Sequence, residues 1–583
     1  MIQSNYFTDN EDLQDHFHNL IDWEEVVKLY EGDFADFQEY SKTKNPKLEM
    51  APSSTEEAVA YYEEILKSVG DISGNYVSQI AKDIDKDGLE FQDGIVTHPQ
   101  KMVDCINLYH EAGLGPVAFQ RRYGGLGLPN VMKAFCSDIM YRSDSSTTIA
   151  AGSMGLAVIL ETIAEEKQKE EWIPKIISQR YTATMGLSEP DFGSDLPSVK
   201  TKAEFKNGEW YLTGSKRYQT VACGINGGPG VTLALARTGT VESGARGLSF
   251  FLVEHKDYQV IGIEKKLGIK ASATCEVVYE NSKAHLVGKE GFGLVKYVMG
   301  MLNGARLSVS SQGTGMTTAA LKEAEKYAKE RIQFGKPIIE IPAVKKILEK
   351  IDRETSAMRC LMVEAALSVD RYLWDQKKDS EKLNGHAKEK NASSDFTDVH
   401  SSKFWEKVAN TLTPISKYYN SETANKMIYD ALQVFGGAGF TEDYDLARLY
   451  RDVRITNIYD GTTQIQVNAA IGGIVSGMSE KGVFRKYLEH LSSFSKLPKI
   501  VLDSLKLLEE IVELYKNIPD SKTKEANSFE VVESAARVIL SLLMEKAANA
   551  KSKLLEKRKL QNKQFHADSL AILEGNKIRL QNL

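Results

Sequence analysis

An α+β multidomain fold is predicted, with an N-terminal all-α domain, a central antiparallel β domain and a helical C-terminal half. Three changes of pattern along the chain support it. Helical spacing of apolar residues prevails over residues 1–180 and gives way to short alternating or β-branched runs over 181–286. Helical spacing returns over 287–473, and a charged amphipathic pattern continues it as an extension over 474–583. These changes divide the chain into four predicted domains.

The first domain is expected to consist mainly of helices. Residues 56–66 carry apolar side chains at helical spacing. The segment 122–129, with three glycines and a proline, interrupts this pattern as a loop.

The central domain is predicted to be compact and mainly antiparallel. Its clearest strand candidates are residues 230–237, 247–254 and 275–279. Asn207-Gly208 lies between two short strand-like segments. It is the strongest local hairpin signal in the chain, because a tight type I′ turn needs positive φ at both central residues.

Helical patterns return in the C-terminal half. Residues 321–331 form a clear amphipathic pattern, which predicts a helix with one buried face. Residues 376–398 are polar and rich in lysine, so we expect a loop or a mobile connection there.

Composition is that of an ordinary globular protein. The 583 residues are 42% hydrophobic and 26% charged, with a net charge of −7 and a pI near 5.9. This charge balance gives no sign of a nucleic-acid surface. A polyanionic ligand such as coenzyme A stays compatible with it, because a local basic pocket does not show in a net charge.

The sequence carries no targeting or metal-binding pattern that we recognise. The acidic, polar N-terminus is unlike a signal or transit peptide, and no uninterrupted apolar run approaches the ~20 residues that a membrane-spanning helix needs. The five cysteines contain no CxxC pair, and the ten histidines form no zinc motif. We therefore expect a cytoplasmic protein with no metal site and no membrane association.

The first candidate for chemistry is the segment Gly186–Asp195. Ser188 and Ser194 are hydroxyl donors that flank a turn, and Gly193 allows a ligand to approach the backbone closely. Such a loop can bind the edge of a flat heterocycle. Taken alone, however, the segment is better explained as a capped turn.

The second candidate is the glycine-rich segment Gln433–Phe440. It does not fit a dinucleotide-binding βαβ motif, because it follows a helical pattern and not a strand. A backbone passing close to a pyrophosphate is the remaining functional interpretation, since glycine removes the side-chain obstacle.

The third candidate is the turn within Ile458–Gln466. Asp460 precedes a glycine ahead of a predicted helix, where a carboxylate can be kept from water and act as a base. An ordinary N-terminal cap of the helix 462–470 explains the same residue and is more probable on local grounds.

Together these three segments resemble the signature elements of the acyl-CoA dehydrogenase family. Residues 329–338 are also similar to the family's R-x-x-F-G-x-P-I flavin element, and the similarity extends from about Asp104 to Gly473. The resemblance implies FAD as cofactor, a barrel- or sandwich-like central domain and a four-helix bundle after it. The helical extension resembles the longer members of the family, which tend to be homodimers.

The resemblance also implies residue roles. Leu187 and Ser188 would meet the flavin pyrimidine edge, Tyr218 would stack beside the flavin, and Thr220 would lie near flavin N5. The rest of the implied FAD site is shared across a dimer: Arg331, Gln333 and Phe334 of one subunit, Gln433 and Gly437 of the other, with Thr462 and Gln464. The implied substrate-binding residues are Ser194, Asn303 and Arg306, with Tyr459 and Gly461 on either side of the base.

The implied reaction is α,β-dehydrogenation of an acyl-CoA thioester to the 2-enoyl-CoA. Asp460 would remove the α-proton while the β-hydrogen leaves as hydride to flavin N5. Electrons would then pass to an electron-transfer flavoprotein. The chain would thus be an FAD-dependent oxidoreductase acting on CH–CH groups in fatty acid or acyl-CoA metabolism.

Asp460 departs from the family pattern, since most members have Glu at this position. The side chain is shorter by one methylene, or ~1.5 Å, and a misplacement of that scale can cost about 10²-fold in rate. Ala305 occupies the alternative base position used by some members, so no second carboxylate is available there. Three readings follow: a working Asp base, which we favour, a nitroalkane-oxidase-like flavoenzyme, and a flavin-binding scaffold without dehydrogenase activity. Linear, branched and alicyclic substrates all stay open.

Overall fold

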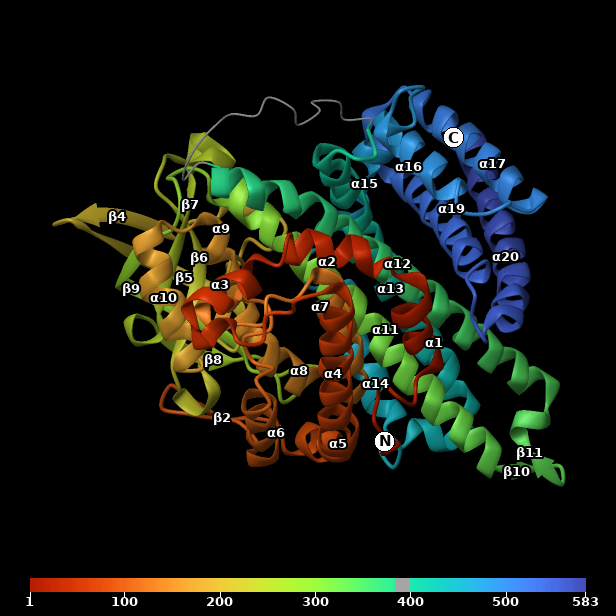
Figure 1. The fold of residues 1–583 in the computed structure, drawn as a ribbon, viewed down its shortest axis with the longest axis horizontal. Helices are drawn as coiled ribbons and strands as arrows, with labels where there is room; N and C mark the ends of the chain where they lie inside the picture. The colour runs from red at the N-terminus through yellow and green to blue at the C-terminus, as the bar shows by residue number, and fades with distance from the viewer. Residues whose placement is uncertain (383–397) are drawn as a thin grey trace. The chain divides into compact units, whose positions relative to one another are not determined.

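The computed structural model describes residues 1–382 and 398–583, with side chains described for 1–373 and 398–583. The chain divides into two compact units, whose helices and strands are labelled in Figure 1. Unit 1 comprises Met1–Tyr6, Asp33–Leu128 and Ile139–Ala305, and unit 2 comprises Phe7–Gly32, Pro129–Asp138 and Arg306–Leu583.

The N-terminal part of unit 1 is helical, as predicted. Its longer helices are α4 (Thr55–Ile72), α5 (Ser78–Asp87), α6 (Gln100–Glu111) and α10 (Glu166–Ser178). Helix α4 begins where Ser54 Oγ accepts the Glu57 N–H at 3.2 Å, an N-cap that satisfies one of the first-turn donors. A short exposed hairpin of β1 (Glu90–Gln92) and β2 (Ile95–Thr97) interrupts the helices.

Within the described residues, Ser145–Ile163 is the stretch long and apolar enough to cross a membrane by length and composition. It consists of α8 (Ser145–Gly152), a 3-10 segment (Ser153–Ile159) and α9 (Leu160–Ile163). About half of this stretch is buried inside the protein. Because buried core segments can be equally long and apolar, this stretch is weak evidence for a membrane span.

The β region of unit 1 forms a seven-stranded sheet within residues 182–286. Strands β4 (Lys202–Lys206), β5 (Glu209–Thr220), β9 (Thr274–Leu286), β7 (Leu248–Glu254) and β6 (Gly230–Arg237) pair in this order. The ring closes because β6 also pairs with both β7 and β4. A barrel-like central domain is thereby confirmed.

Two strands lie outside this ring. Strand β8 (Gln259–Ile263) pairs antiparallel with β9, and β3 (Thr182–Gly186) pairs parallel with β6. The parallel β3–β6 pair, and the single parallel β4–β6 pairing, depart from the predicted antiparallel sheet. Strands β4 and β5 lie between β3 and β6 in the sequence, so no local turn could reveal the parallel pairing of β3 with β6.

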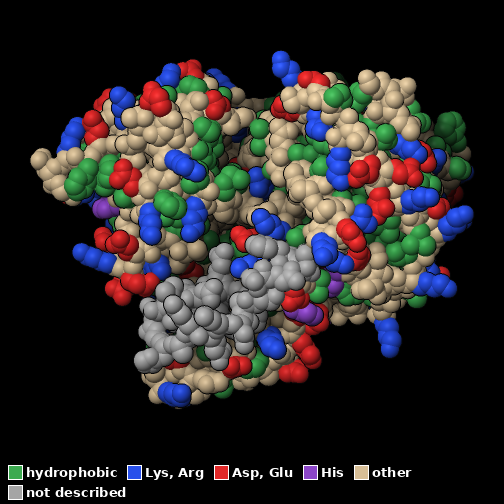
Figure 2. Space-filling view, turned by 90° about the horizontal axis from the view of Figure 1, so that it is seen from above, with side chains coloured by type: hydrophobic (Ala, Val, Ile, Leu, Met, Phe, Trp, Pro, Cys, Tyr) green, Lys and Arg blue, Asp and Glu red, His purple; other side chains and the backbone are tan. Residues whose placement is uncertain are grey.

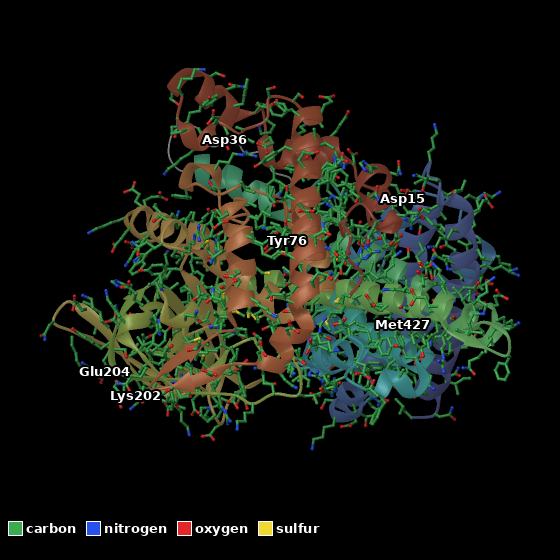
Figure 3. The ribbon with its side chains drawn as sticks, turned by 90° about the horizontal axis from the view of Figure 1, so that it is seen from below. Asp15, Asp36, Tyr76, Lys202, Glu204 and Met427 are labelled. Carbon is green, nitrogen blue, oxygen red and sulfur yellow. The ribbon has the colours of Figure 1, made fainter. Side chains whose placement is uncertain are left out.

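The predicted hairpin at Asn207-Gly208 is confirmed. Lys206 pairs with Glu209 across it, and Asn207 and Gly208 have φ of 53° and 84°. Both central residues are thus left-handed, as a tight two-residue turn requires. Lys202 and Glu204 lie on β4 in Figure 3, and both side chains are exposed.

Alternation along β6 sends its side chains into two different core clusters of unit 1. Leu233 and Leu235 pack with Phe250 and the helical segments, whereas Ala234 and Ala236 pack with Phe251 and the other face of the sheet. Every residue of β6 is buried, because both faces of the strand are covered.

Long helices form the centre of unit 2. They are α11 (Met299–Glu330, in unit 2 from Arg306), α12 (Pro342–Lys382), α13 (Ser402–Val434) and α15 (Thr463–Gly477). Asn420 on α13 ties three of them together, because its amide donates to Ser310 Oγ at 2.8 Å and to Met358 O at 2.9 Å. The loop expected at 376–398 falls mainly outside the described residues, and its first part, 376–382, continues α12.

The C-terminal extension consists of helices packed on this bundle. They are α16 (Val483–Ser492), α17 (Lys499–Lys516), α18 (Ser521–Ala526), α19 (Ser528–Ala548) and α20 (Leu555–Gln581). Helix α19 contacts α12 and α15 and also packs against α17 and α20 (Figure 1). Most of its side chains are buried, which makes the extension part of the core of unit 2.

A buried ion-pair network joins the extension to the N-terminal segment of unit 2. Arg558 on α20 donates to Asp15 at 2.7 Å and to Asp12 at 3.1 Å. Asp15, labelled in Figure 3, is the last residue of α1 (Glu11–Asp15). Asp12 also pairs with Arg359 on α12. On the face that Figure 2 shows, by contrast, acidic and basic side chains are interspersed at the surface.

Arg558→Met tests how much this ion-pair network contributes to the stability of the fold. It takes the guanidinium away from buried Asp15 and from partly buried Asp12, which keeps Arg359, so we expect a loss of about 3 kcal/mol in the free energy of unfolding. The matched control is Lys559→Met, since Lys559 and its partner Glu556 are both exposed. Chemical denaturation measures both variants. Equal midpoints for the two would contradict the assigned role of Arg558.

Candidate active site

Asp460 lies in a turn between α14 (Leu446–Val453) and α15. Asp460 and Gly461 both adopt left-handed backbone conformations, with φ of 53° and 89°. The positive φ favours glycine at position 461, and a Cβ there would lie 2.6 Å from Gln466 Nε2 and displace the amide that donates to this turn. Asp460 is half-buried and keeps part of its surface accessible.

Donors from α13 and α15 and a contact from α11 hold this turn. Gln466 Nε2 donates to the carbonyl oxygens of Asp460 and Gly461, at 2.9 Å each. Lys417 Nζ on α13 donates to the Gly461 carbonyl at 2.6 Å. Tyr459 donates its hydroxyl proton to Gln312 on α11. The backbone of the candidate base is thus fixed on both sides.

Burial and nearby cations act on Asp460 in opposite directions. Burial raises the pKa of its carboxyl group, whereas the charges of Lys417 and Arg306 lower it, and the net pKa is raised above the ordinary 3.8. Burial lowers the pKa of Lys417 to about 8, against the opposing charges of Asp460 and Glu422. A carboxylate of this kind is a stronger base than an exposed aspartate and is still held in the charged form by its neighbours.

The sequence did not single out Lys417, Gln312 or Gln466. Gln466 lay inside the third motif without an assigned role. Lys417 carried one weak signal, a cation inside the long helical pattern of residues 402–434, most of whose neighbours are small, apolar or aromatic. Its partner is far away in sequence, so this signal alone assigns no function.

In unit 1 a second buried lysine fixes the loop that carries Leu187 and Ser188. Lys216 Nζ donates to Leu187 O and to Glu189 Oε1, at 3.0 Å each. Glu189 also accepts the Lys200 and Thr201 N–H groups at 2.7 and 2.8 Å. Burial lowers the pKa of Lys216 to about 8. Burial by itself raises the pKa of Glu189. The Lys216 charge and these N–H donors act in the opposite direction and keep the pKa of Glu189 below its usual value.

The structure brings Ser188 and Tyr218 to neighbouring positions. The Arg217 N–H donates to Ser188 O at 2.9 Å, at the point where the β5–β9 register shifts between Lys216 and Gln219. Tyr218 has a left-handed φ of 62°, and its side chain is 56% exposed. Thr220 follows on the same strand and pairs with Thr274. An exposed aromatic ring beside a rigid loop edge fits a flat heterocycle such as flavin.

The other predicted FAD residues are surface residues of unit 2. Arg331 and Gln333 are exposed, and Phe334, at the tip of the hairpin β10 (Ile332–Gln333)–β11 (Lys336–Pro337), is 90% exposed. Exposed residues also include Gln433, Gly437, Thr462 and Gln464. Phe440, which follows the glycine-rich segment, is 91% exposed. Large exposed aromatic side chains of this kind are typical of surfaces that bind a partner or ligand.

The predicted substrate-binding residues are divided between the units. Ser194 lies exposed on a loop of unit 1. Asn303 and Arg306 are both buried on α11, Asn303 within unit 1 and Arg306 within unit 2. Among the residues that the structure describes, no group of three His, Cys, Asp or Glu side chains is arranged to hold a metal ion.

Comparison with known proteins identifies the family. The acyl-CoA dehydrogenase N-terminal domain matches residues 61–180, the middle domain 184–282, and the C-terminal domain 291–381 and 403–473. An acyl-CoA dehydrogenase of Bacillus subtilis is 32% identical over 365 residues, which cover 61% of this chain and 85% of that protein.

Two solved structures share the fold. The first is an acyl-CoA dehydrogenase from Bacillus anthracis complexed with FAD, with a TM-score of 0.71 and 21% identity. The match covers 89% of this chain and 88% of the Bacillus anthracis chain. The second comes from a study of the electron transferring flavoprotein of Acidaminococcus fermentans and has a TM-score of 0.58 and 25% identity. This match covers 70% of this chain and 96% of the matched chain.

The chain therefore belongs to the acyl-CoA dehydrogenase family. It is an FAD-dependent oxidoreductase of that family.

Lys216→Met tests whether the buried pair holds the loop at Leu187 and Ser188. The change leaves Glu189 buried without its cation, so we expect a loss of about 3 kcal/mol in stability and weaker retention of FAD. Thermal unfolding and the ratio of flavin to protein absorbance measure the two effects. Lys206→Met is the control, because its pair with Glu204 is exposed. Full FAD retention and an unchanged midpoint in Lys216→Met would exclude this role.

Proposed function

We propose that this chain dehydrogenates an acyl-CoA thioester between Cα and Cβ, with Asp460 as the base. The observation that carries the proposal is the half-buried Asp460 carboxyl group, which has a raised pKa and sits in a turn fixed by α13 and α15. This carboxyl group occupies the base position of the family motif.

The proposed step balances simply. The Asp460 carboxylate takes the α-proton and becomes a carboxylic acid, the β-hydrogen leaves as hydride, and a Cα–Cβ double bond forms. FAD, when bound, supplies the hydride acceptor. Arg306 and Lys417 keep Asp460 ionised before the step, and hydrogen bonds to the thioester carbonyl would stabilise the charge that develops there.

The residues proposed to bind FAD occur in each unit. In unit 1 they are Leu187, Ser188, Tyr218 and Thr220. In unit 2 they form two exposed groups, which a homodimer would bring together: Arg331, Gln333 and Phe334 on one subunit, and Gln433 and Gly437 on the other, with Thr462 and Gln464. The proposed substrate-binding residues are Ser194 and Asn303 in unit 1 and Arg306, Tyr459 and Gly461 in unit 2.

We further propose an electron-transfer flavoprotein as the acceptor and a cytoplasmic location within fatty acid or acyl-CoA metabolism. The first is supported by the structural match from the study of such a flavoprotein. The cytoplasmic location is supported by the five cysteines, each of which is a free buried thiol.

Asp460→Asn tests the base. The amide cannot accept the proton, so anaerobic bleaching of the flavin by a substrate should fall by at least ~10³-fold, while FAD stays bound. Stopped-flow absorbance with linear, branched and cyclohexane-carboxyl thioesters measures it and at the same time finds the substrate class. Fast reduction of this variant would identify a different base. Turnover of a nitroalkane in place of any thioester would favour the nitroalkane-oxidase-like reading.

The pH profile of the wild-type rate follows from the same carboxyl group. Asp460 must be ionised to act, so the rate should fall as pH drops through its pKa, which lies above 3.8. Rapid-mixing rates across the acidic range give the position of this limb. A rate constant that does not change down to pH 4 would speak against Asp460 as the base.

Phe334→Ser tests the proposed dimer. A side chain that is 90% exposed contributes little to the monomer fold, so its loss should weaken self-association and FAD binding without lowering monomer stability. Sedimentation velocity and flavin absorbance are the measurements. The control is Phe205→Ser, which changes a 60% exposed phenylalanine of the β4–β5 hairpin. The same association state in both variants would contradict a dimer surface at Phe334.

A further inference from the structure

Lys417 is an unusual residue to find at the centre of a long helix. It lies in the middle of α13 and is completely buried. Its flanking residues Ser416, Tyr418 and Asn420 are buried as well. Removing an ammonium group from water is costly unless hydrogen bonds and opposite charge compensate. The groups that compensate for Lys417 therefore indicate what it does.

The hydrogen bond of Lys417 goes to the backbone of the candidate active-site turn. Its amine donates to Gly461 O at 2.6 Å, and Gln466 Nε2 donates to the same oxygen at 2.9 Å. Two donors on one carbonyl fix the peptide between Gly461 and Thr462, one residue after the peptide that Asp460 begins. Because Asp460 and Gly461 are both left-handed, the turn depends on such contacts from outside.

The charged groups that act on Lys417 belong to three elements of the structure. Asp460 faces it from the turn, Arg306 from α11, and Glu422 from its own helix. Glu422 is already engaged, because it accepts hydrogen bonds from Asn457, at 2.9 Å, and from Thr463. Of the two acids, Asp460 acts on Lys417 more strongly than Glu422 does, and Arg306 adds a second positive charge near Asp460.

We propose that Lys417 is a positioning residue for proton abstraction, which fixes the turn next to Asp460 through the Gly461 carbonyl and supplies a positive charge to the half-buried carboxylate. This inference rests on the proposed function. Burial makes Asp460 a stronger base but also favours its protonated, inactive form. Lys417 opposes that second effect, so the site combines a strong base with a charged resting state.

Two substitutions separate the two parts of this role. Lys417→Met removes both the charge and the hydrogen bond to Gly461 O, whereas Lys417→Gln removes the charge and keeps an amide donor. Lys426→Met is the matched control, since Lys426 is an exposed lysine of the same helix. All variants are compared as FAD-loaded full-length proteins.

The first experiment does not depend on substrate. Melting temperatures are measured for wild type, Lys417→Met, Asp460→Asn and the double variant. If the two side chains interact, the loss caused by Lys417→Met should be several degrees larger with Asp460 present than in the Asp460→Asn background, because an uncompensated carboxylate is left behind. Equal losses in the two backgrounds overturn the proposal. Where Lys417→Met does not fold, Lys417→Gln takes its place in the cycle.

The second experiment measures flavin reduction by an acyl-CoA thioester across pH. We expect Lys417→Met to be ~10²-fold slower near neutral pH, and its acid limb to move up by about one pH unit. Lys417→Gln should show the same movement with a smaller overall loss, and Lys426→Met should match wild type. A loss of rate that is uniform across pH, or wild-type behaviour of Lys417→Met, overturns the proposal.

The two experiments keep the inference separate from the proposed function. If no thioester reduces the wild-type flavin, the proposed function fails, and the melting-temperature cycle alone decides whether Lys417 and Asp460 are coupled.

Discussion

The hydrogen bond from Lys417 to the Gly461 carbonyl is the contact on which the candidate active site depends most. Two consecutive left-handed residues direct the Asp460 and Gly461 carbonyls inward, where they need donors. Lys417 and Gln466 supply them from α13 and α15. The packing of the bundle helices thus sets the position of one carboxylate, and the buried contacts of Asn420 maintain that packing.

In unit 1 a buried lysine likewise donates a hydrogen bond to a backbone carbonyl, at the loop of Leu187 and Ser188. Lys216, completely buried like Lys417, donates to a loop carbonyl and balances one acid, Glu189. The pKa of each lysine is lowered by burial to about 8. A buried lysine is a poor way to gain stability, because its desolvation opposes folding. Its use at both loops is better explained by the need to hold irregular backbone in one conformation.

The sequence predicted these elements to different extents. Patterns that depend on near neighbours were sufficient for the order of helical and β regions and for the Asn207-Gly208 turn, because adjacent residues determine both. The parallel β3–β6 pair and the burial of Arg558 against Asp15 depend on residues far apart in the chain. The motif placed Asp460 at the turn, and its role as base stays a prediction. The supporting residues Lys417 and Gln312 became visible only when distant helices were brought together.

The fixed turn also bears on the shorter side chain of Asp460. A turn free to move could advance by the ~1.5 Å that one methylene would have supplied. Here the hydrogen bonds to both carbonyls and the contact of Tyr459 with Gln312 oppose such a movement. Under the proposed reaction, the substrate must therefore bring its α-carbon closer to the carboxylate. An acyl group whose shape or branching places Cα deeper would satisfy this better than a flexible straight chain, so the rigidity of the turn acts as a constraint on the substrate.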